Sequence, residues 1–385
     1  MIRLAHVSTF PPAQCGIGNY SQELVHALAR AAGDVEVVVL AEREPGVADT
    51  ANVRRVWDRR GRWDEELLRA IVQVQPDVVH FQHEQAFFGS DPRFDHLCGA
   101  LRARGIHPVL TMHSVPLGRK AAALHRRLGA AADRIVVHQR AGMATALAEQ
   151  GVPAERVAII AHGTPEWELP DRAAARQRLE LPADVPLALF FGFIHTGKRV
   201  HTALSAFEQT ARALPGARLV VVGRIREDNV FQRIYSRWLQ QRLARGVASG
   251  RVVFRSGFVP PEHKPAYFAA ADLVVLPHVQ AYGSASGVLH EAIASRRAFL
   301  CTRGDKFAEA VDALARELPE AFPRAGDHAA WVRGFEALLG SPDTRARMSE
   351  LTVGLGKATS WTASAERHAA LYRELAGRDR VRDAS

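Results

Sequence analysis

The sequence predicts an α/β protein made of two doubly wound halves of similar size. Short apolar runs, rich in Val, Ile and Leu, alternate with helical patterns along most of the 385 residues. Such continuous runs are typical of parallel strands covered on both faces, and the intervening helices supply the crossovers. One segment with three prolines, residues 165–184, interrupts the alternation, and we interpret it as an inter-domain linker.

In the first half, after a strand-like amino terminus, strands are expected at residues 35–40, 77–81, 108–112, 134–137 and 157–160, with helices at 21–31 and 64–74. In the second half, strands are expected at residues 187–191, 218–222, 252–254, 273–276 and 299–301, with helices at 200–213, 228–246 and 264–270. We therefore expect an N-terminal domain over 1–165, a linker over 166–184, a second domain over 185–355 and a final segment over 356–385. Two such halves facing one another would form a ligand cleft at their strand ends.

The composition is that of a globular protein, with 47% hydrophobic and 24% charged residues. No apolar run approaches the ~20 residues that span a bilayer, and the amino terminus does not resemble a signal peptide. Three widely spaced cysteines exclude a disulfide framework and a cysteine-based zinc site. A cytoplasmic protein is the simplest expectation.

The net charge of +9 is unevenly distributed. Residues 1–170 hold 19 basic and 19 acidic residues, so the remaining 31 basic and 22 acidic residues carry the whole excess. A positive field in this second half would attract a small dianionic ligand. Nucleic acid is not expected, because the chain lacks the aromatic-interleaved basic motifs of the usual binding modules.

Residues 282–291 are the most informative stretch of the second half. Two glycines and two serines stand where a buried strand passes into a helix, so backbone amides there can face a ligand. The candidate anion-binding residues are Ser286, Gly287, Val288 and Leu289. Glu291, one turn into the helix, can accept from a ribose diol; the alternative is an ordinary strand–helix turn with Glu291 as a solvated or capping residue.

Loops after strands of the first half also carry candidate residues. Gly16 and Gly18 precede the first helix and allow close backbone approach, although a tight turn explains them as well. His83 and Glu84 follow one strand, and His113 follows the next. Histidine there can bind a sugar hydroxyl or transfer a proton. The third glycine and the acidic residue of the dinucleotide fingerprint are missing, which disfavours a dehydrogenase.

In the second half, Lys198 and Arg199 stand at a strand–helix junction, and Arg224 follows the next strand. Lys198 is well placed to neutralise a diphosphate. The chain has no G-x-S-x-G, Walker lysine loop or H-E-x-x-H motif. It also lacks a D-x-D pair after a strand, so no metal site is expected.

These loops, in this order, resemble the retaining glycosyltransferases of family 4, which have the two-domain GT-B fold. The similarity extends over nearly the whole chain and rests on F-P-P-x-x-C-G-I-G-x-Y (10–20), V-V-H-F-Q-H-E-x-x-F-F-G (78–89), T-M-H (111–113), I-I-A-H-G-T (159–164), the strand–loop–helix run at 269–300, and Ser-Trp at 360–361 before the last helix. The last helix of such enzymes crosses back onto the N-terminal domain.

The resemblance implies transfer of a sugar from a nucleotide-sugar donor, such as a GDP- or UDP-sugar, to an acceptor hydroxyl with retention and without a metal or other cofactor. By the same resemblance, Gly16 and Gly18 approach the donor and His113 faces the transferred sugar. Lys198 neutralises the diphosphate, the amides near residues 287–289 cap the phosphates, and Glu291 holds the ribose. The acceptor is a sugar, glycan, lipid-linked or small molecule.

Two positions depart from the family pattern. The first of the family's paired glutamates falls on Gly283, and the arginine that accompanies the lysine falls on Phe193, so Arg199 or Arg224 would substitute. Two alternatives therefore stay open: a nucleotide-sugar 2-epimerase of the same fold, with Glu84 as acid–base candidate, or a degenerate scaffold without activity.

Similar enzymes also use a basic N-domain helix to meet anionic lipid. Residues 117–132 (LGRKAAALHRRLGAAA) have that character, although the apolar face is weak. The sequence favours a solvated helix, with weak peripheral contact at the inner face of the membrane as the alternative.

Overall fold

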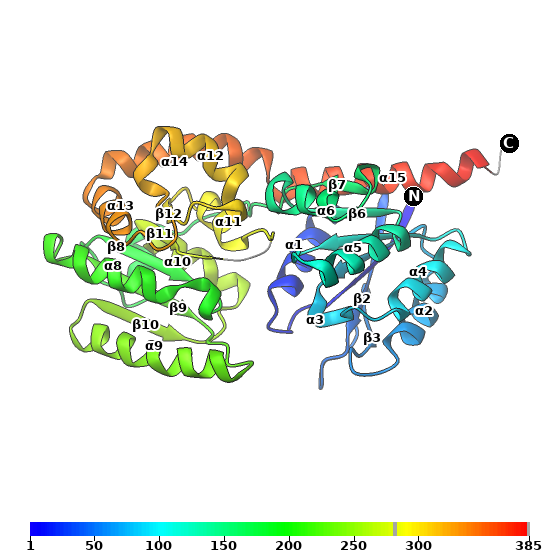
Figure 1. Ribbon diagram of the computed structural model, residues 1–385, viewed down its shortest axis with the longest axis horizontal. Coiled ribbons are helices and arrows are strands. Elements are labelled where there is room, and N and C mark those ends of the chain that lie inside the picture. Colours follow the sequence, from blue (N-terminus) through cyan, green and yellow to red (C-terminus); the bar gives the residue numbers. More distant parts are fainter. Residues whose placement is uncertain (280–282, 383–385) are drawn as a thin grey trace. The chain divides into compact units, whose positions relative to one another are not determined.

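The computed structural model describes residues 1–279 and 283–382, and Tyr282 of the stretch discussed above lies outside them. The chain divides into two compact units, each of the doubly wound α/β type expected (Figure 1). Unit 1 comprises residues 1–163, 281–285 and 359–385, and unit 2 comprises residues 164–280 and 286–358.

Unit 1 contains a parallel sheet of seven strands in the order β3-β2-β1-β4-β5-β6-β7. The strands are β1 (Ile2–Ser8), β2 (Val35–Glu42), β3 (Val53–Trp57), β4 (Val78–His83), β5 (His107–Met112), β6 (Arg134–Val137) and β7 (Val157–Ile159). The helices are α1 (Gly16–Ala31), α2 (Trp63–Val74), α3 (Gln85–Phe88), α4 (Arg93–Arg102), α5 (Arg119–Ala131), α6 (Thr145–Glu149) and α15 (Trp361–Arg382).

Both faces of this sheet are covered, which explains the nearly continuous apolar strands. One core cluster joins the sheet to α2, α4 and α5, and another joins it to α1 and α15. Because all strands run parallel, their carboxyl ends share one edge, and His83, the last residue of β4, lies there beside the end of β5 that precedes His113.

Unit 2 contains a parallel sheet of five strands in the order β10-β9-β8-β11-β12. The strands are β8 (Leu187–Phe191), β9 (Arg218–Gly223), β10 (Val252–Ser256), β11 (Leu273–Leu276) and β12 (Ala298–Cys301). The helices are α7 (Arg172–Arg178), α8 (Val200–Ala213), α9 (Val230–Ala248), α10 (Lys264–Ala270), α11 (Gly287–Ala294), α12 (Ala308–Glu317), α13 (His328–Gly340) and α14 (Pro342–Ala358).

Two local expectations need correction. Helix α1 begins at Gly16, not after Tyr20, so Gly16 and Gly18 lie in its first turn rather than in a loop. The proline-containing segment 166–184 holds helix α7, because Asp171 caps it by accepting from the amides of Ala173 and Ala174. Ala175 of α7 is buried in the core of unit 2. The segment is therefore an integral part of that unit.

The basic helix expected at residues 117–132 is α5. Its apolar residues Ala121, Leu124 and Leu128 are buried, and the two leucines belong to the core of unit 1. The face considered for a membrane is thus already covered by the protein itself. In the described part of the chain, no helix combines the length and apolarity that a membrane crossing requires.

Candidate functional site

The loops at the carboxyl edge of the unit 2 sheet are tied to one another by backbone hydrogen bonds. The loop after β11 meets the loop after β8 where the amide of Val279 donates to the carbonyl of Gly197 at 2.9 Å. The loop after β9 meets the same β8 loop where the amide of Ile194 donates to the carbonyl of Arg224 at 2.9 Å. These ties fix the residues that follow three neighbouring strands.

Gly223, at the end of β9, allows two of these loops to approach closely. Its φ is +156°, and a Cβ atom there would lie 1.8 Å from the carbonyl oxygen of Gly192. No other residue type fits this contact without moving the backbone. A Cβ at Gly192 would in turn lie 3.5 Å from Val288, so the start of α11 packs on the same turn.

Lys198 lies in the centre of this arrangement, in a short 3-10 turn that continues the β8 loop. Its Nζ is 3.4 Å from Nδ1 of His278, which follows β11. Desolvation lowers the pKa of Lys198 to about 8, and the negative charge of Glu291 opposes that shift. At neutral pH the lysine is a partly desolvated ammonium, and a dianion bound beside it would be strongly attracted.

A second lysine lies close to Lys198. Lys306 follows β12 and lies next to Phe307, whose ring packs on His278 with 5.8 Å between centroids. Burial lowers the pKa of Lys306 well below its ordinary value, and the charge of Lys198 lowers it further. The positive charge of Lys198 therefore disfavours the charged form of Lys306, and a bound anion beside the two lysines would favour it.

His278 supplies a hydrogen-bond donor to the same region. Burial, followed by the charges of Lys198 and Lys306, lowers its pKa well below the ordinary value, so the ring is neutral. Because Nδ1 accepts from Lys198, Nε2 carries the hydrogen. Among the described residues, that nitrogen has no hydrogen-bond partner.

Two hydroxyl groups near these strand ends also lack a hydrogen-bond partner among the described residues. Within the part of the chain that the structure describes, the Oγ of Ser286 and the Oγ1 of Thr302 are buried and have no protein partner. Ser286 stands at the N-cap position of α11 without making a side-chain capping bond, and Thr302 follows β12. Buried polar atoms without partners are rare and costly, and donors that converge at strand ends fit a ligand that carries oxygen atoms.

Helix α11 contributes its amino terminus and Glu291. The first amides, at Gly287 and Val288, belong to the turn whose amides have no partner within the helix, as the sequence predicts. Glu291 is 8% exposed, and its Oε1 accepts from Nζ of Lys264 at 2.7 Å. Lys264 therefore holds the carboxylate in place and balances its charge.

The two arginines suggested as substitutes lie differently. Arg199 follows Lys198 with φ of +49°, and its charge acts on His201 at the start of α8, whose pKa is lowered to about 4 mainly by desolvation. The side chain of Arg224 is exposed. Phe193, at the position of the family arginine, packs toward Phe258 with ring centroids 6.4 Å apart.

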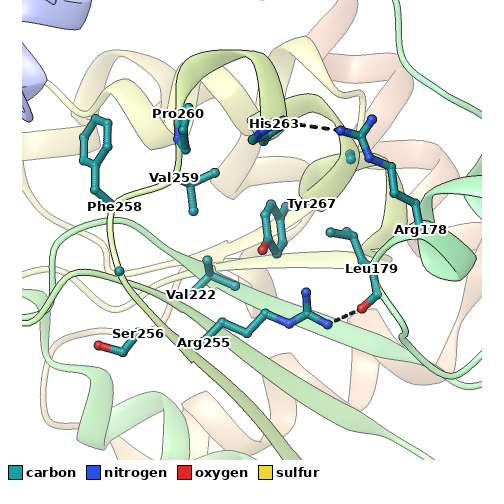
Figure 2. A pocket seen from close by; sticks show the side chains of 12 residues that line it. Arg178, Leu179, Val222, Arg255, Ser256, Phe258, Val259, Pro260, His263 and Tyr267 are labelled. Carbon is teal, nitrogen blue, oxygen red and sulfur yellow. Dashed lines mark hydrogen bonds between the residues drawn. The ribbon is translucent and has the colours of Figure 1, made fainter. Parts of the chain in front are cut away.

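A cavity of about 330 Å³ lies in unit 2 beside α10. Its wall includes Val222, Phe258, Val259 and Tyr267, and Figure 2 shows Tyr267 in the middle of the lining. Arg178 borders it, donating to Nδ1 of His263 at 3.1 Å. Helix α10 carries both Tyr267 and Lys264, the partner of Glu291, so one helix connects this cavity with the carboxylate.

Unit 1 brings its own candidates together at its carboxyl edge. The amide side chain of Gln82, on β4, accepts from Nε2 of His113 at 2.8 Å, and burial lowers the pKa of His113 well below its ordinary value. His83 is buried as well, with a pKa of about 4. Glu84 caps α3 and accepts from the hydroxyl of Ser114. Its carboxylate is thus engaged in local structure.

Gly18 is buried, and a Cβ there would be in ordinary contact with Thr9, at 3.4 Å. Gly16 is exposed at the first turn of α1. Gly283 differs sharply, because a Cβ at this position would lie 1.7 Å from the carbonyl oxygen of Gly142. The missing carboxylate at 283 thus coincides with a position that has no room for any side chain.

Comparison with known proteins shows the family of this chain. The family model described as Glycosyltransferase Family 4 matches residues 15–166, and the model described as Glycosyl transferases group 1 matches residues 185–340. The chain is a group 1 glycosyltransferase.

Alignments with several known proteins extend over almost the whole of this glycosyltransferase. D-inositol 3-phosphate glycosyltransferase of Kineococcus radiotolerans is 25% identical over an alignment covering 97% of this chain and 94% of the relative. Sucrose-phosphate synthase of Thermosynechococcus elongatus superposes with a TM-score of 0.75, at 20% identity over 97% of this chain and 99% of the other. The structure of Anabaena HepE in complex with UDP and glucose superposes with a TM-score of 0.73, at 15% identity over 97% of this chain and 100% of the other. The fold is therefore of the GT-B type.

Four residues of this glycosyltransferase's unit 2 arrangement were not among the sequence candidates: Lys264, His278, Thr302 and Lys306. Three of them directly follow a strand or its loop, the same signal that singled out His83 and His113. The pairing of Lys264 with Glu291 joins residues 27 positions apart and depends on the packing of α10 beside α11.

Proposed function

We propose that this glycosyltransferase uses a nucleoside-diphosphate sugar as donor and transfers the sugar to an acceptor hydroxyl with retention of configuration. The observation that carries the proposal is the convergence of Lys198, Lys306 and the unpartnered donor of His278 at one sheet edge. A diphosphate has the negative charge that the two lysines attract and the oxygen atoms to which Nε2 of His278 can donate.

In this proposal, each group of unit 2 has a defined role. Lys198 neutralises the negative charge that develops on the departing diphosphate, and the amides at the start of α11, with Ser286, bind its oxygens. Lys306 adds a second cation. Glu291 accepts from the ribose hydroxyls, oriented by Lys264. The cavity beside Tyr267 takes the base.

Positive charge from lysines and backbone amides supports a reaction that needs no divalent ion, because these groups do the work of neutralising the diphosphate. The protein then requires no dissociable cofactor, and the nucleotide sugar is its substrate. Fixed donors of this kind stabilise the leaving group without the reorganisation that water would need.

Residues of unit 1 serve the sugar and the acceptor in this proposal. His113, held by Gln82, is a neutral imidazole that can contact the transferred sugar. His83 and Glu84 are acceptor-side candidates, and Gly16 and Gly18, at the start of α1, are candidates for contact with the donor. For the acceptor, a sugar or sugar phosphate is the first class to test, since one relative is named a D-inositol 3-phosphate glycosyltransferase.

A panel of UDP-, GDP- and ADP-sugars, incubated with candidate acceptors, tests the proposal. Release of free nucleoside diphosphate together with a product whose anomeric configuration matches the donor supports it. The reaction should continue after addition of a chelator. Conversion of the donor sugar to its 2-epimer, inverted product, or strict dependence on added Mg²⁺ or Mn²⁺ would each overturn a named part of the proposal.

A further inference from the structure

Helix α9 of unit 2 presents an unusual number of apolar side chains to solvent. Among the described residues, ten large hydrophobic side chains are exposed, and five of them lie on this one helix. They are Val230, Phe231, Ile234, Trp238 and Val247. Phe231 is 81% exposed and Ile234 61%. A concentration of this kind on a single element is a mark of an interaction surface, whereas scattered exposed residues are ordinary.

Three of these exposed residues form a stripe along the outer face of the helix. Phe231, Ile234 and Trp238 follow one another at spacings of three and four, so they share one face. The opposite face is fixed to the unit, because Leu239 and Leu243 are buried in its core. Strand β10, against which α9 packs, is one of the two edge strands of the sheet (Figure 1).

The charges of α9 have one sign. The helix contains four arginines and no aspartate or glutamate. Arg242 is directed inward, donating to Glu208 at 2.7 Å, and lies over the ring of Trp238, 5.6 Å from its centroid. Arg233, Arg237 and Arg245 are exposed, so the apolar stripe is bordered by cations.

We propose that the outer face of α9 docks onto an anionic lipid bilayer. Phe231, Ile234 and Trp238 enter the headgroup region, while Arg233, Arg237 and Arg245 contact lipid phosphates. Aromatic and aliphatic side chains bordered by arginine on one helix face fit this interface, where apolar groups and phosphates lie within a few ångströms of each other. The proposal goes beyond the proposed reaction and does not depend on it.

Charge complementarity favours lipid over the other occupants. A second copy of the chain, packed through the same face, would bring its arginines against these arginines. A nucleic acid would satisfy the arginines, but it would leave Phe231 and Ile234 in water. An anionic bilayer satisfies both kinds of residue at once.

Co-sedimentation of the full chain with vesicles tests the proposal. The vesicles contain phosphatidylcholine alone or with about 30% phosphatidylglycerol, at about 0.05 M and 0.5 M salt. The protein should bind the anionic vesicles at low salt and lose most of the binding at high salt or without phosphatidylglycerol. Phe231→Ser with Ile234→Ser should weaken binding about tenfold or more, and Arg233→Gln with Arg237→Gln and Arg245→Gln should do the same.

Two matched variants serve as controls. Val353→Ser changes an exposed apolar residue on α14, and Leu117→Ser changes one beside α5; both should bind as the unaltered protein does. Circular dichroism and the melting temperature verify that every variant is folded. Absence of binding to anionic vesicles at low salt overturns the proposal. Binding that is lost in Leu117→Ser but kept in the α9 variants overturns it too. A concentration-dependent dimer that the Phe231→Ser, Ile234→Ser variant abolishes would assign this face to a second copy instead.

Discussion

Lys198 and His278 lie side by side in unit 2, with Nζ of the lysine 3.4 Å from Nδ1 of the imidazole. The two residues follow β8 and β11, neighbours in the sheet, so the fold itself creates this pair. A buried neutral imidazole accepts from the ammonium without cancelling its charge. The charge therefore stays available for a ligand, and its protonation controls what the site can bind.

The first prediction concerns alkaline pH. Desolvation lowers the pKa of Lys198 to about 8, so the free enzyme loses this positive charge as the pH rises through that value. The kcat/KM for the donor should fall about tenfold per pH unit above the pKa. In an active Lys198→Arg variant, this fall in kcat/KM should move to much higher pH, since arginine stays charged. A kcat/KM that is flat to pH 10 in the unaltered enzyme would remove Lys198 from the titrating step.

The second prediction concerns Glu291. Its contact with the ribose is equal in the ground and transition states, so Glu291→Gln should raise the donor KM about tenfold and change kcat little. Glutamine keeps the shape but weakens the pairing with Lys264, so thermal stability must be measured alongside. Glu262→Gln, at an exposed position just before α10, is the matched control and should change neither constant. A fall in kcat with KM unaltered would contradict the assignment.

The third prediction concerns acid stability of unit 1. Histidines from β1, β4 and α15 are buried together: His6, His80 and His368. The hydroxyl of Tyr372, on α15, lies 2.6 Å from Nδ1 of His80, and the hydroxyl of Thr111, on β5, lies 2.7 Å from Nε2 of the same ring. Burial, with repulsion from other histidines as a smaller effect, lowers the pKa of His6 to about 3 and that of His80 well below its ordinary value. Burial also lowers the pKa of His368 to about 4, although its hydrogen bond to the carbonyl of Ser364 opposes this shift.

These histidines are neutral in the folded protein but take up protons on unfolding below about pH 6.5. Stability is therefore complete above that pH and is lost as the pH falls toward the folded pKa values. Each histidine costs about 1.4 kcal/mol at pH 5.5, so together about 4 kcal/mol are lost. Urea unfolding at several pH values measures this. His6→Leu should remove about 1.4 kcal/mol of the stability lost at pH 5.5, because neither ring nitrogen of His6 has a partner among the described residues. His26→Leu, a substitution on the exposed side of α1, is the control variant.

The fourth prediction concerns the docking of α15 within unit 1. A Cβ at Gly163 would lie 2.0 Å from the buried ring of Trp361, the first residue of the helix. Gly163→Ala should therefore displace the ring and destabilise the protein by about 1–3 kcal/mol. Gly99→Ala, in α4 with no atom within 4 Å of the added carbon, should be neutral or slightly stabilising. Equal melting temperatures for the two variants would show that α15 does not rest on this contact.

Most strands could be predicted because the sequences of buried parallel strands are continuous apolar runs. Strand β3 (Val53–Trp57) was not, since its sequence VRRVW lies at the sheet edge and carries two arginines. The helix in the expected linker was not predicted, because prolines flank it and its start depends on one capping residue, Asp171. The division into two units follows from the alternation of strands and helices alone.

The candidate site was predictable where a residue's role follows from its place after a strand, as for Lys198 and Ser286. It was not predictable where the role arises from packing. Three features depend on packing in the folded chain: the lack of space for a side chain at Gly283, the ion pair of Glu291 with Lys264, and the proximity of Lys306 to Lys198. The same holds for α5 and α9, since only burial shows which apolar helix face remains exposed.

Titration of nucleoside diphosphates into Lys198→Ala tests the central claim most directly. The unaltered enzyme should bind UDP, GDP or ADP more tightly than the matching nucleoside monophosphate, and Lys198→Ala should weaken diphosphate binding and lower turnover by about 10²–10³, a loss of roughly 3–4 kcal/mol. Lys357→Ala, at an exposed lysine of α14, should behave as the unaltered enzyme. A folded Lys198→Ala variant that binds the diphosphate and turns over the donor as well as the unaltered enzyme would contradict the account.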